Sequence, residues 1–484
     1  MSYETAITRM YALGHELANA ASHKFDLAHM RVLLGALNRP ERKFPGVLIA
    51  GTNGKGSTAA TLAAILRASG LRTGLYTSPH LMRINERIRI GGNEISDDDF
   101  ALLHDVVDRT AERLVEEGEL PWHPSFFEML TAIAFEYFAQ NKVEIAVLEV
   151  GMGGRLDATN VIEPRVSVIT DISLDHQNFL GNTVAEIARE KAGIIRPGGV
   201  VVTLPQQPQA NDVIGNTILE WGAQGVSAVP YVPPVSPGSD QYLIGTVESA
   251  AGRHKNTAHG VSRGSEAQGD RASSGRQEDH DTDECLVSRY PLQVMGEQIL
   301  VETPLVGRHQ LRNIALAIAT AEVLSHRGFA ITPESIERGI RETHWPGRFQ
   351  VMPATDGAPE YVFDVAHNPA GAWALRSTLS ARYEDRPLTF VFGAMRDKAI
   401  GEIAEILFPL ATRVIATRAD SPRSATPDQI REAAARTAVD IEDAVDVASA
   451  LARARSLAGA QGIVVITGSI YIVGEAMRAL GVRI

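Results

Sequence analysis

The stretch Gly51-Thr52-Asn53-Gly54-Lys55-Gly56-Ser57 decides how this chain is organised. It follows an apolar run from Gly46 to Ala50, which predicts a buried strand, and precedes an Ala- and Leu-rich run from Thr58 to Ser69, which predicts a helix. A glycine loop between a strand and a helix suits phosphate, because its backbone N–H groups can crowd an anion and the helix start adds a positive dipole end. We therefore predict a nucleotide site, with Lys55 reaching the outer phosphates and Ser57 offering a hydroxyl to phosphate or to its magnesium.

This loop differs from the usual phosphate-loop pattern, G-x-x-x-x-G-K-[ST]. It is shorter, and Gly56 separates Lys55 from Ser57. The alternative is a glycine-rich turn that only connects the strand to the helix. Because the lysine, the serine and the flanking elements are all suitably placed, nucleotide binding is the interpretation we favour.

The composition is that of a water-soluble globular protein. The 484 residues are enough for two or three domains, and the hydrophobic and charged fractions of 44% and 21% are ordinary. The formal net charge of −12 argues against a sequence-independent nucleic-acid binder, which needs a basic surface. We expect no nucleic-acid partner.

The cysteine content and the apolar runs indicate a compartment. Cys285 is the only cysteine, so no intrachain disulfide can form. Residues 1–27 contain no apolar targeting core, and no run approaches the roughly 20 apolar residues of a membrane span. We expect a cytoplasmic protein without a membrane partner, acting as a monomer.

Alternating strands and helices predict an α/β fold. The residues from 6 to 37 have helical spacing, and further helices are expected at 97–117, 125–141 and 183–191. Apolar runs predict additional strands at 72–77, 145–150, 166–170 and 200–204. This order is typical of a mostly parallel sheet covered on both faces, a P-loop-type ATPase domain.

Four candidate residues follow these predicted strands. Gly51, Ser78, Glu149 and His176 lie at or just beyond strand ends. Ligands of such sheets bind at the carboxyl ends of the strands, so we expect these residues to converge there.

The character of the chain changes from about 236 to 288, where Gly, Ser and charged residues dominate. A metal cluster could be suspected around Asp281 and Cys285, but a solvated insertion without fixed structure is the interpretation we favour. Order is expected to resume near Tyr290, with helices at 309–327 and 333–342.

A second alternating unit follows Trp345. Strands are expected at 361–364, 388–392, 413–416 and 463–466, with helices between them. We predict an ATP-binding domain over 1–345, including the 236–288 insertion, and a smaller Rossmann-like α/β domain over 346–484. No dinucleotide fingerprint opens the second domain, so we do not infer NAD binding.

Several polar residues could bind a metal or phosphate. A carboxylate at Glu149 needs a partner, and with Ser78 and His176 it could hold a hard cation. The alternatives are a salt bridge from Glu149 to Arg155 and a hydrogen-bonded loop position for His176. Lys191, taken alone, reads as an exposed lysine at a helix end.

Three further candidates lie where the second domain begins. Arg348 could bind phosphate through two hydrogen bonds. Asp364 ends a predicted strand and could accept hydrogen bonds from a ribose, with His367 close by.

Taken together, the motifs resemble the folylpolyglutamate synthase and dihydrofolate synthase branch of the Mur ligase superfamily. They occur in the family's order over nearly the whole chain, the 236–288 insertion excepted: GTNGKGS at Gly51, TSPHL at Thr77, EVGMGGRLDATN at Glu149, DHQNFLGNT at Asp175, EKAGIIRPG at Glu190, GRHQLRN at Gly307, WPGR at Trp345, DVAHNP at Asp364 and TGSIYIVGE at Thr467.

The resemblance implies an ATP-dependent amide ligase. A pteroate or folate carboxylate would attack the γ-phosphate of ATP to form an acyl phosphate, and the amine of L-glutamate would then displace phosphate. Phosphoryl transfer needs positioning and charge neutralisation, which the loop, Lys55 and magnesium could supply. A cleft between two domains would close on substrate and exclude water.

The resemblance also implies roles for individual residues. The residues that the resemblance places in contact with ATP are Gly54, Lys55, Gly56, Ser57, Asn313, Arg348 and Asp364. Ser78 and Glu149 resemble ligands of one Mg²⁺, and Glu149 and His176 ligands of a second. The pteroate-site segments correspond to Ser125, Phe126, Phe127 and Glu128, and to Leu156, Asp157 and Ala158.

The reacting centre is expected to involve Lys55, Lys191 and His367. Lys191 corresponds to a lysine that is carbamylated in the family, which would turn a cation into an anion able to approach the second metal. The chain departs from the family at Asp397-Lys398-Ala399, where a second aspartate is common.

Two other functions compete with this one. A cell-wall Mur ligase has a nucleotide-sugar domain before its loop, whereas only 50 residues precede Gly51 here. A non-catalytic nucleotide-binding regulator would bind ATP without substrate-dependent phosphate release. Dihydropteroate and reduced folates both remain possible acceptors.

Overall fold

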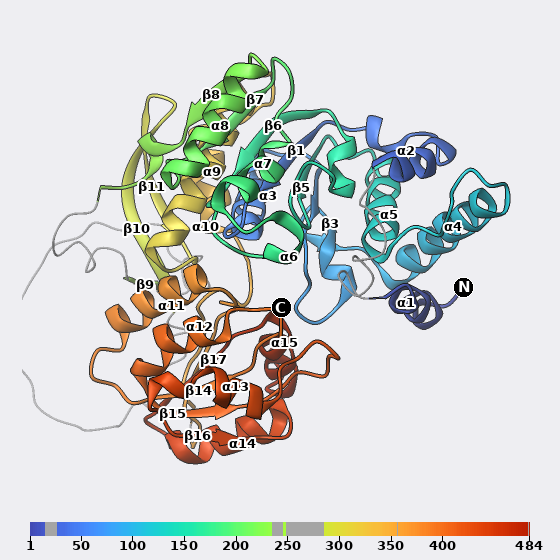
Figure 1. Cartoon of the computed structure of the whole chain (residues 1–484). Coiled ribbons are helices and arrows are strands. Elements are labelled where there is room, and N and C mark those ends of the chain that lie inside the picture. The colour runs from blue at the N-terminus through green and yellow to red at the C-terminus, as the bar shows by residue number, and fades with distance from the viewer. Residues whose placement is uncertain (15–26, 235–244, 248–284, 356, 483) are drawn as a thin grey trace, which may run out of the picture.

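Two parallel-rich sheets, each with helices on both faces, dominate the computed structural model of the chain (Figure 1). It describes residues 1–14, 27–234, 245–247, 285–355, 357–482 and 484. The predicted α/β class is therefore confirmed. The insertion predicted at 236–288 lies largely outside these residues.

The first sheet has eight strands in the order β4-β3-β2-β5-β1-β6-β7-β8. The six strands from β2 to β8 in this order run parallel, while β3 and β4 are antiparallel additions at one edge. The central strands are apolar almost without interruption because both faces are covered. The bounds are β1 Gly46–Ala50, β2 Thr73–Tyr76, β3 Ile88–Ile90, β4 Asn93–Glu94, β5 Ile145–Glu149, β6 Pro164–Ile169, β7 Val200–Thr203 and β8 Gln224–Ser227.

Two hydrophobic cores lie on the opposite faces of this sheet. One contains side chains from α1, α2, α4, α5, α7 and α8, and the other contains side chains from α3, α9 and α10. The short α6 lies beside α7. The bounds are α1 Tyr3–Ala12, α2 Leu27–Ala36, α3 Lys55–Ala68, α4 Asp97–Glu116, α5 Phe126–Gln140, α6 Gln177–Leu180, α7 Val184–Ala192, α8 Pro208–Glu220, α9 Arg308–Ser325 and α10 Pro333–Arg341.

Helix boundaries near the N-terminus differ from the prediction. The span 6–37 is not one helix, because α1 ends at Ala12 and Gly14 takes a left-handed φ of 90°, while α2 begins at Leu27. A positive φ breaks the helical hydrogen-bond pattern. Residues 15–26 lie outside the described part of the chain.

A small antiparallel sheet packs over α10, with strands in the order β11-β10-β9. These strands are β9 Gly245–Val247, β10 Cys285–Val294 and β11 Glu297–Thr303. The expectation that 236–288 has no fixed structure is therefore wrong for 245–247 and 285–288. Backbone pairing between β9 and β10 orders these residues.

The second large sheet has six strands in the order β12-β13-β17-β14-β15-β16, all parallel except β12. Every strand lies after residue 345, and we propose 345/346 as the boundary between a first and a second domain. The strands are β12 Gln350–Met352, β13 Glu360–Phe363, β14 Leu388–Phe392, β15 Ala411–Ala416, β16 Ile441–Asp443 and β17 Ile463–Thr467, and the helices are α11 Pro369–Arg382, α12 Ile400–Leu407, α13 Pro427–Ala433, α14 Val447–Ala458 and α15 Ile470–Ala479.

The two domains meet through the loop that follows β2. Leu81 and Met82 of this loop pack against the second-domain core, and Arg478 donates to the Met82 carbonyl at 3.1 Å. Gly474 of α15 allows the approach, since an added Cβ would lie 2.0 Å from the Leu81 carbonyl oxygen. The glycine thus sets how closely the domains can pack.

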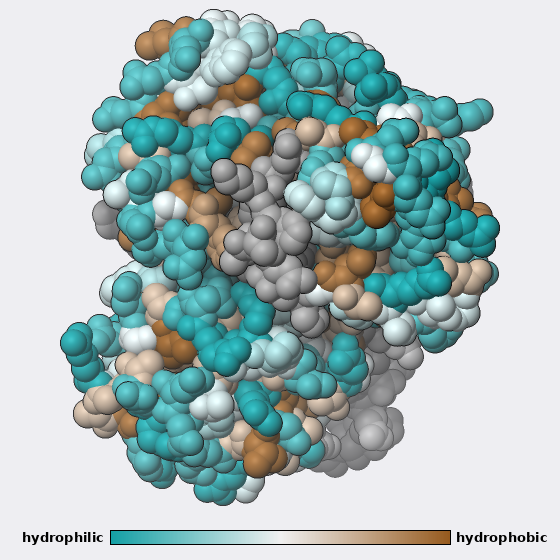
Figure 2. All heavy atoms as spheres, turned by 45° about the vertical axis from the view of Figure 1, so that its right-hand side comes forward, coloured by the Kyte–Doolittle hydropathy of each residue, from teal (hydrophilic) through white to brown (hydrophobic). Residues whose placement is uncertain are grey.

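The outer surface is mostly hydrophilic on the face shown in Figure 2, with apolar groups scattered over it. Leu219 and Val445, the most exposed of the large apolar side chains, belong to different domains. In the described ranges, every helix is too short or too polar to span a bilayer.

Candidate active site

The strands that carry the predicted site residues are neighbours in the first sheet. β2, β5, β1 and β6 occupy adjacent positions and run parallel, so their carboxyl ends meet at one edge. Gly51 follows β1, Ser78 lies two residues after β2, Glu149 ends β5, and His176 lies in the loop after β6. The expected convergence at the sheet edge is thus present in the fold.

The glycine loop runs directly into α3. Gly54 is its N-cap residue, with a left-handed φ of 86°, and the helix begins at Lys55 instead of the predicted Thr58. An added Cβ at Gly54 would lie 2.1 Å from the Asn313 side-chain oxygen, so only glycine fits. The backbone N–H groups of Thr52 and Asn53 both donate to the carbonyl of residue 171, at 2.8 and 3.2 Å.

Lys55 and Glu149 face each other at the start of α3. The Lys55 Nζ donates to the Thr52 carbonyl at 3.3 Å and lies 4.0 Å from Glu149 Oε1. Burial raises the pKa of Glu149, and Lys55 opposes that shift. The Ser78 backbone N–H donates to the other carboxylate oxygen at 3.2 Å.

The alternative salt bridge from Glu149 to Arg155 is wrong. Arg155 pairs instead with Glu190 of α7 at 2.9 Å. The Glu149 carboxylate therefore remains directed toward the glycine loop.

His176 occupies a strained position at the N-cap of the short α6. Its φ is 49°, and its buried Nδ1 has no hydrogen-bond partner. Burial, reinforced by Lys398, lowers its pKa to about 4, so the imidazole is neutral at pH 7 and can act as a ligand. The alternative of a hydrogen-bonded loop histidine does not describe Nδ1.

Ser78, Glu149 and His176 offer a hydroxyl, a carboxylate and a neutral imidazole. Within the described ranges, no three His, Cys, Asp or Glu side chains are grouped to hold a metal ion by themselves. The unpartnered His176 Nδ1 and the buried Glu149 carboxylate fit a divalent cation that also takes oxygen atoms from phosphate.

Lys191 is buried, contrary to the exposed position expected for it. Only 4% of the residue is exposed, and its Nζ donates to the Gly51 carbonyl at 2.7 Å. Burial, followed by the charge of Lys55, lowers the pKa of Lys191 to about 7. Lys191 is buried because the loop containing Gly154 packs closely against the end of α7. A Cβ added at Gly154 would lie only 2.6 Å from the Glu190 carbonyl oxygen.

Asn313, Arg348 and Asp364 lie along the junction of the domains. The Asn313 amide nitrogen donates to Gln310 at 2.9 Å, which turns its oxygen toward Gly54. The Asp364 carboxylate accepts the N–H groups of Phe349 and Ala366, both at 2.9 Å. Burial raises the pKa of Asp364 to about 6, opposed by Arg348.

The junction also contains residues that the sequence interpretation did not assign to the site. Asp175 lies 3.7 Å from His367 Nε2 and 2.6 Å from the Nζ of Lys398. Asn368, the N-cap of α11, reaches Asn53 of the glycine loop at 2.9 Å. Asp175 and Asn368 stand inside the quoted motifs DHQNFLGNT and DVAHNP, and Lys398 stands in the departure at 397–399, but no role was assigned to them.

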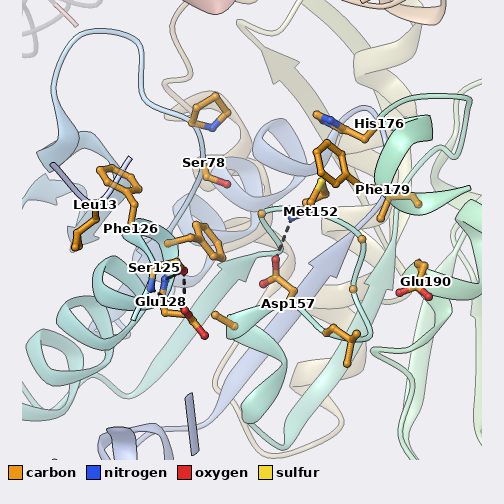
Figure 3. A pocket seen from close by; sticks show the side chains of 18 of the residues that line it. Leu13, Ser78, Ser125, Phe126, Glu128, Met152, Asp157, His176, Phe179 and Glu190 are labelled. Atoms are coloured by element: carbon orange, nitrogen blue, oxygen red, sulfur yellow. Dashed lines mark hydrogen bonds between the residues drawn. The ribbon is translucent and has the colours of Figure 1, made fainter. Parts of the chain in front are cut away.

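A cavity of about 610 Å³ lies between the domains and is lined by residues of both. Figure 3 shows Phe126 and Leu13 along one side and Phe179, Met152 and His176 along the other. Such an apolar cavity with a few polar groups suits a flat aromatic ligand with a charged end. The predicted substrate residues that line it are Ser125, Phe126, Phe127, Glu128, Leu156, Asp157 and Ala158.

Three of these lining residues also organise the local backbone. Ser125 and Glu128 form a capping box at the start of α5. Asp157 is buried and accepts the Met152 N–H at 3.0 Å, as drawn in Figure 3, and the Thr159 N–H at 3.0 Å. These hydrogen bonds fix the backbone of the cavity wall.

Comparisons with known proteins agree with this arrangement. The Mur ligase middle domain family matches residues 125–220, and the Mur ligase glutamate ligase domain family matches residues 347–470. A dihydrofolate synthase/folylpolyglutamate synthase of Bacillus subtilis is 33% identical over 414 residues, which is 85% of each chain.

Two solved structures share the whole fold. Mycobacterium tuberculosis folylpolyglutamate synthase, complexed with ADP and AMPPCP, has a TM-score of 0.78 at 31% identity, and the alignment covers 98% of this chain and 99% of that one. An FPGS–AMPPCP–folate complex has a TM-score of 0.72 at 30% identity, covering 99% of this chain and 100% of that one.

Proposed function

This chain belongs to the folylpolyglutamate synthase and dihydrofolate synthase family of Mur ligases, and we propose that it adds L-glutamate to both dihydropteroate and reduced folates. The family activity is ATP-dependent glutamate ligation. The observation that carries the proposal is the cavity, in which a nucleotide-facing edge and an aromatic wall share one space between the domains. We also propose that the enzyme works as a monomer.

The reaction divides between the two sides of the cavity. A carboxylate oxygen of the acceptor attacks the γ-phosphorus of ATP, the bond to the β-phosphate oxygen breaks, and ADP leaves with that electron pair. The glutamate amine then attacks the acyl carbon, loses a proton and expels inorganic phosphate. Water must be excluded in between, because it would hydrolyse the acyl phosphate.

We assign the phosphates to the start of α3. Gly54, Gly56 and Ser57 present backbone N–H groups there, and Lys55 places its ammonium beside the outer phosphates. Asn313 and Arg348 approach from α9 and the domain junction. Asp364 holds that junction through its two backbone hydrogen bonds.

Ser78, Glu149 and His176 would hold magnesium, as two ions in the manner of the family. Bound Mg²⁺ would neutralise charge on the phosphate oxygens during transfer. The neutral imidazole and the carboxylate are the chain's own contribution, and the charge of Lys55 opposes the rise in pKa that burial causes at Glu149.

We further propose that Lys191 becomes carbamylated. With a pKa of about 7, much of its amine is neutral at physiological pH and can add CO₂, giving a carbamate and releasing one proton. The amine must first leave the Gly51 carbonyl, which it contacts at 2.7 Å. Density for a plain amine in an ATP–magnesium crystal grown with bicarbonate would contradict this proposal.

An acceptor panel tests the function. Phosphate release should require ATP, L-glutamate and an acceptor together, and should occur with both dihydropteroate and tetrahydrofolate. Release with only one acceptor would restrict the enzyme to one activity. Equal release in every combination would favour a nucleotide-binding regulator.

A further inference from the structure

One carboxylate joins the two domains next to Lys398 and His367, which line the cavity. Asp175, in the first-domain loop after β6, contacts three side chains of the second domain. Its Oδ1 accepts from Lys398 at 2.6 Å, and its Oδ2 lies 3.3 Å from the Asn368 amide nitrogen and 3.7 Å from His367 Nε2. The contacts therefore come from two separate loops of the second sheet, those after β13 and β14.

The ion pair is almost closed to solvent. The side chains of Asp175 and Lys398 are each 9% exposed. Burial alone would raise the pKa of Asp175, but His176 and Lys398 hold it below its usual range. A buried ion pair of this kind is strongly destabilised when one partner is removed, because the other charge is left without compensation.

Asn368 connects the same contact to the glycine loop. Its oxygen caps α11 by accepting the Gly371 N–H at 2.8 Å, which fixes the side chain. Its amide nitrogen then donates to Asn53 at 2.9 Å as well as approaching Asp175. The start of α11 is thereby tied to both the phosphate-binding loop and the loop that carries His176.

We propose that Asp175 is a positioning residue whose pairing with Lys398 holds the two domains closed over the cavity and aligns the glycine loop with the second domain. The proposal rests on the proposed function for its catalytic consequence only. When the pair separates, both charges can regain water, so an open state is accessible. When it forms, the Nε2 atoms of His176 and His367 lie 4.0 and 3.7 Å from the same oxygen, Oδ2 of Asp175.

A different role for Lys398 makes a different prediction. Lys398 lines the cavity, so its ammonium could instead contact an acidic substrate directly. In that case the loss of Lys398 would weaken glutamate binding, and the loss of Asp175 would act independently. If the Asp175–Lys398 pair holds the domains closed, the loss of either residue breaks the same contact, so the second loss adds little to the first.

The test is a double-mutant cycle with Asp175→Asn, Lys398→Met and the double variant. Domain closure is followed by single-molecule energy transfer between dyes at Leu219→Cys and Val445→Cys in a Cys285→Ser background. Both labelled positions are 79% exposed and lie in different domains. The control is the solvent-accessible ion pair of Glu442 and Arg453, which lies within the second domain and is removed by Glu442→Gln with Arg453→Met.

We expect each single variant to lower kcat by about tenfold or more and the double variant to lie within about threefold of the worse single variant. The interdomain distance should lengthen or broaden in all three, while the Kd for MgADP stays within about twofold and the control pair changes neither readout. If the kcat losses of the two single variants multiply in the double variant, or if the interdomain distance distribution is unchanged, the proposal that the pair holds the domains closed is refuted. Because the distance needs no turnover, absence of ligase activity in the wild type would refute the proposed function separately.

Discussion

Replacing Lys55 with alanine should remove most of the transition-state stabilisation at the phosphate site. The ammonium lies 4.0 Å from the Glu149 carboxylate and is largely buried, so a phosphate oxygen bound beside it would lie at a similar distance. At about 4 Å and an effective dielectric constant of about 20, one charge pair contributes about 4 kcal/mol. That energy corresponds to a roughly 1,000-fold fall in kcat/KM.

The assay is ADP release in the presence of acceptor and glutamate, with unfolding followed in parallel. Lys43→Ala is the control, because it removes an exposed lysine ammonium from the same domain and should leave turnover unchanged. The same substitution at Lys55 also leaves Glu149 buried without its main cation, so the carboxyl should take up a proton more readily. A correctly folded Lys55→Ala enzyme within about tenfold of wild type would refute the reasoning.

Three further predictions concern packing and pH. Gly54→Ala should weaken MgADP binding by about tenfold or more, because the new Cβ clashes with Asn313 and the left-handed φ is strained for alanine. Gly70→Ala is the control: its φ is strained in the same way but its Cβ meets no other atom, so the Kd for MgADP should not change. Gly474→Ala should lower kcat by disturbing the domain contact, although alanine favours a helix; an unchanged kcat would show that the contact is dispensable. Burial lowers the pKa of His104, so the unfolded chain takes up a proton at this residue at a higher pH than the folded protein does. The free energy of unfolding should therefore fall as the pH drops below the unfolded pKa of about 6.5. His104→Leu should make the free energy of unfolding depend less on pH, as measured by denaturant titrations at pH 7.5 and 5.5.

The central strands could be predicted from the sequence because burial on both faces makes them continuously apolar. β1, β5 and β14 are fully buried and match their predicted runs closely. β8, at the sheet edge, has mostly exposed residues and was missed. β9 and the start of β10 were missed because their neighbours along the chain are polar and only pairing between the strands orders them.

The candidate site could be predicted where it follows the strand order. Glu149 and the glycine loop lie on neighbouring strands, so local sequence was enough to place them together. Lys191 could not be placed, because its burial depends on the loop containing Gly154 packing against α7. The pairing of Asp175 with Lys398 joins residues 223 positions apart and depends on how the domains dock.

The most direct test of the central claim follows one oxygen atom through the reaction. An acceptor labelled with ¹⁸O in its carboxylate should transfer one labelled oxygen to the inorganic phosphate in each turnover, because that oxygen attacks the γ-phosphorus and stays with it. Mass spectrometry of the released phosphate reads the outcome. Unlabelled phosphate formed together with the glutamylated product would contradict an acyl phosphate and the phosphate site assigned to Lys55 and the glycine loop.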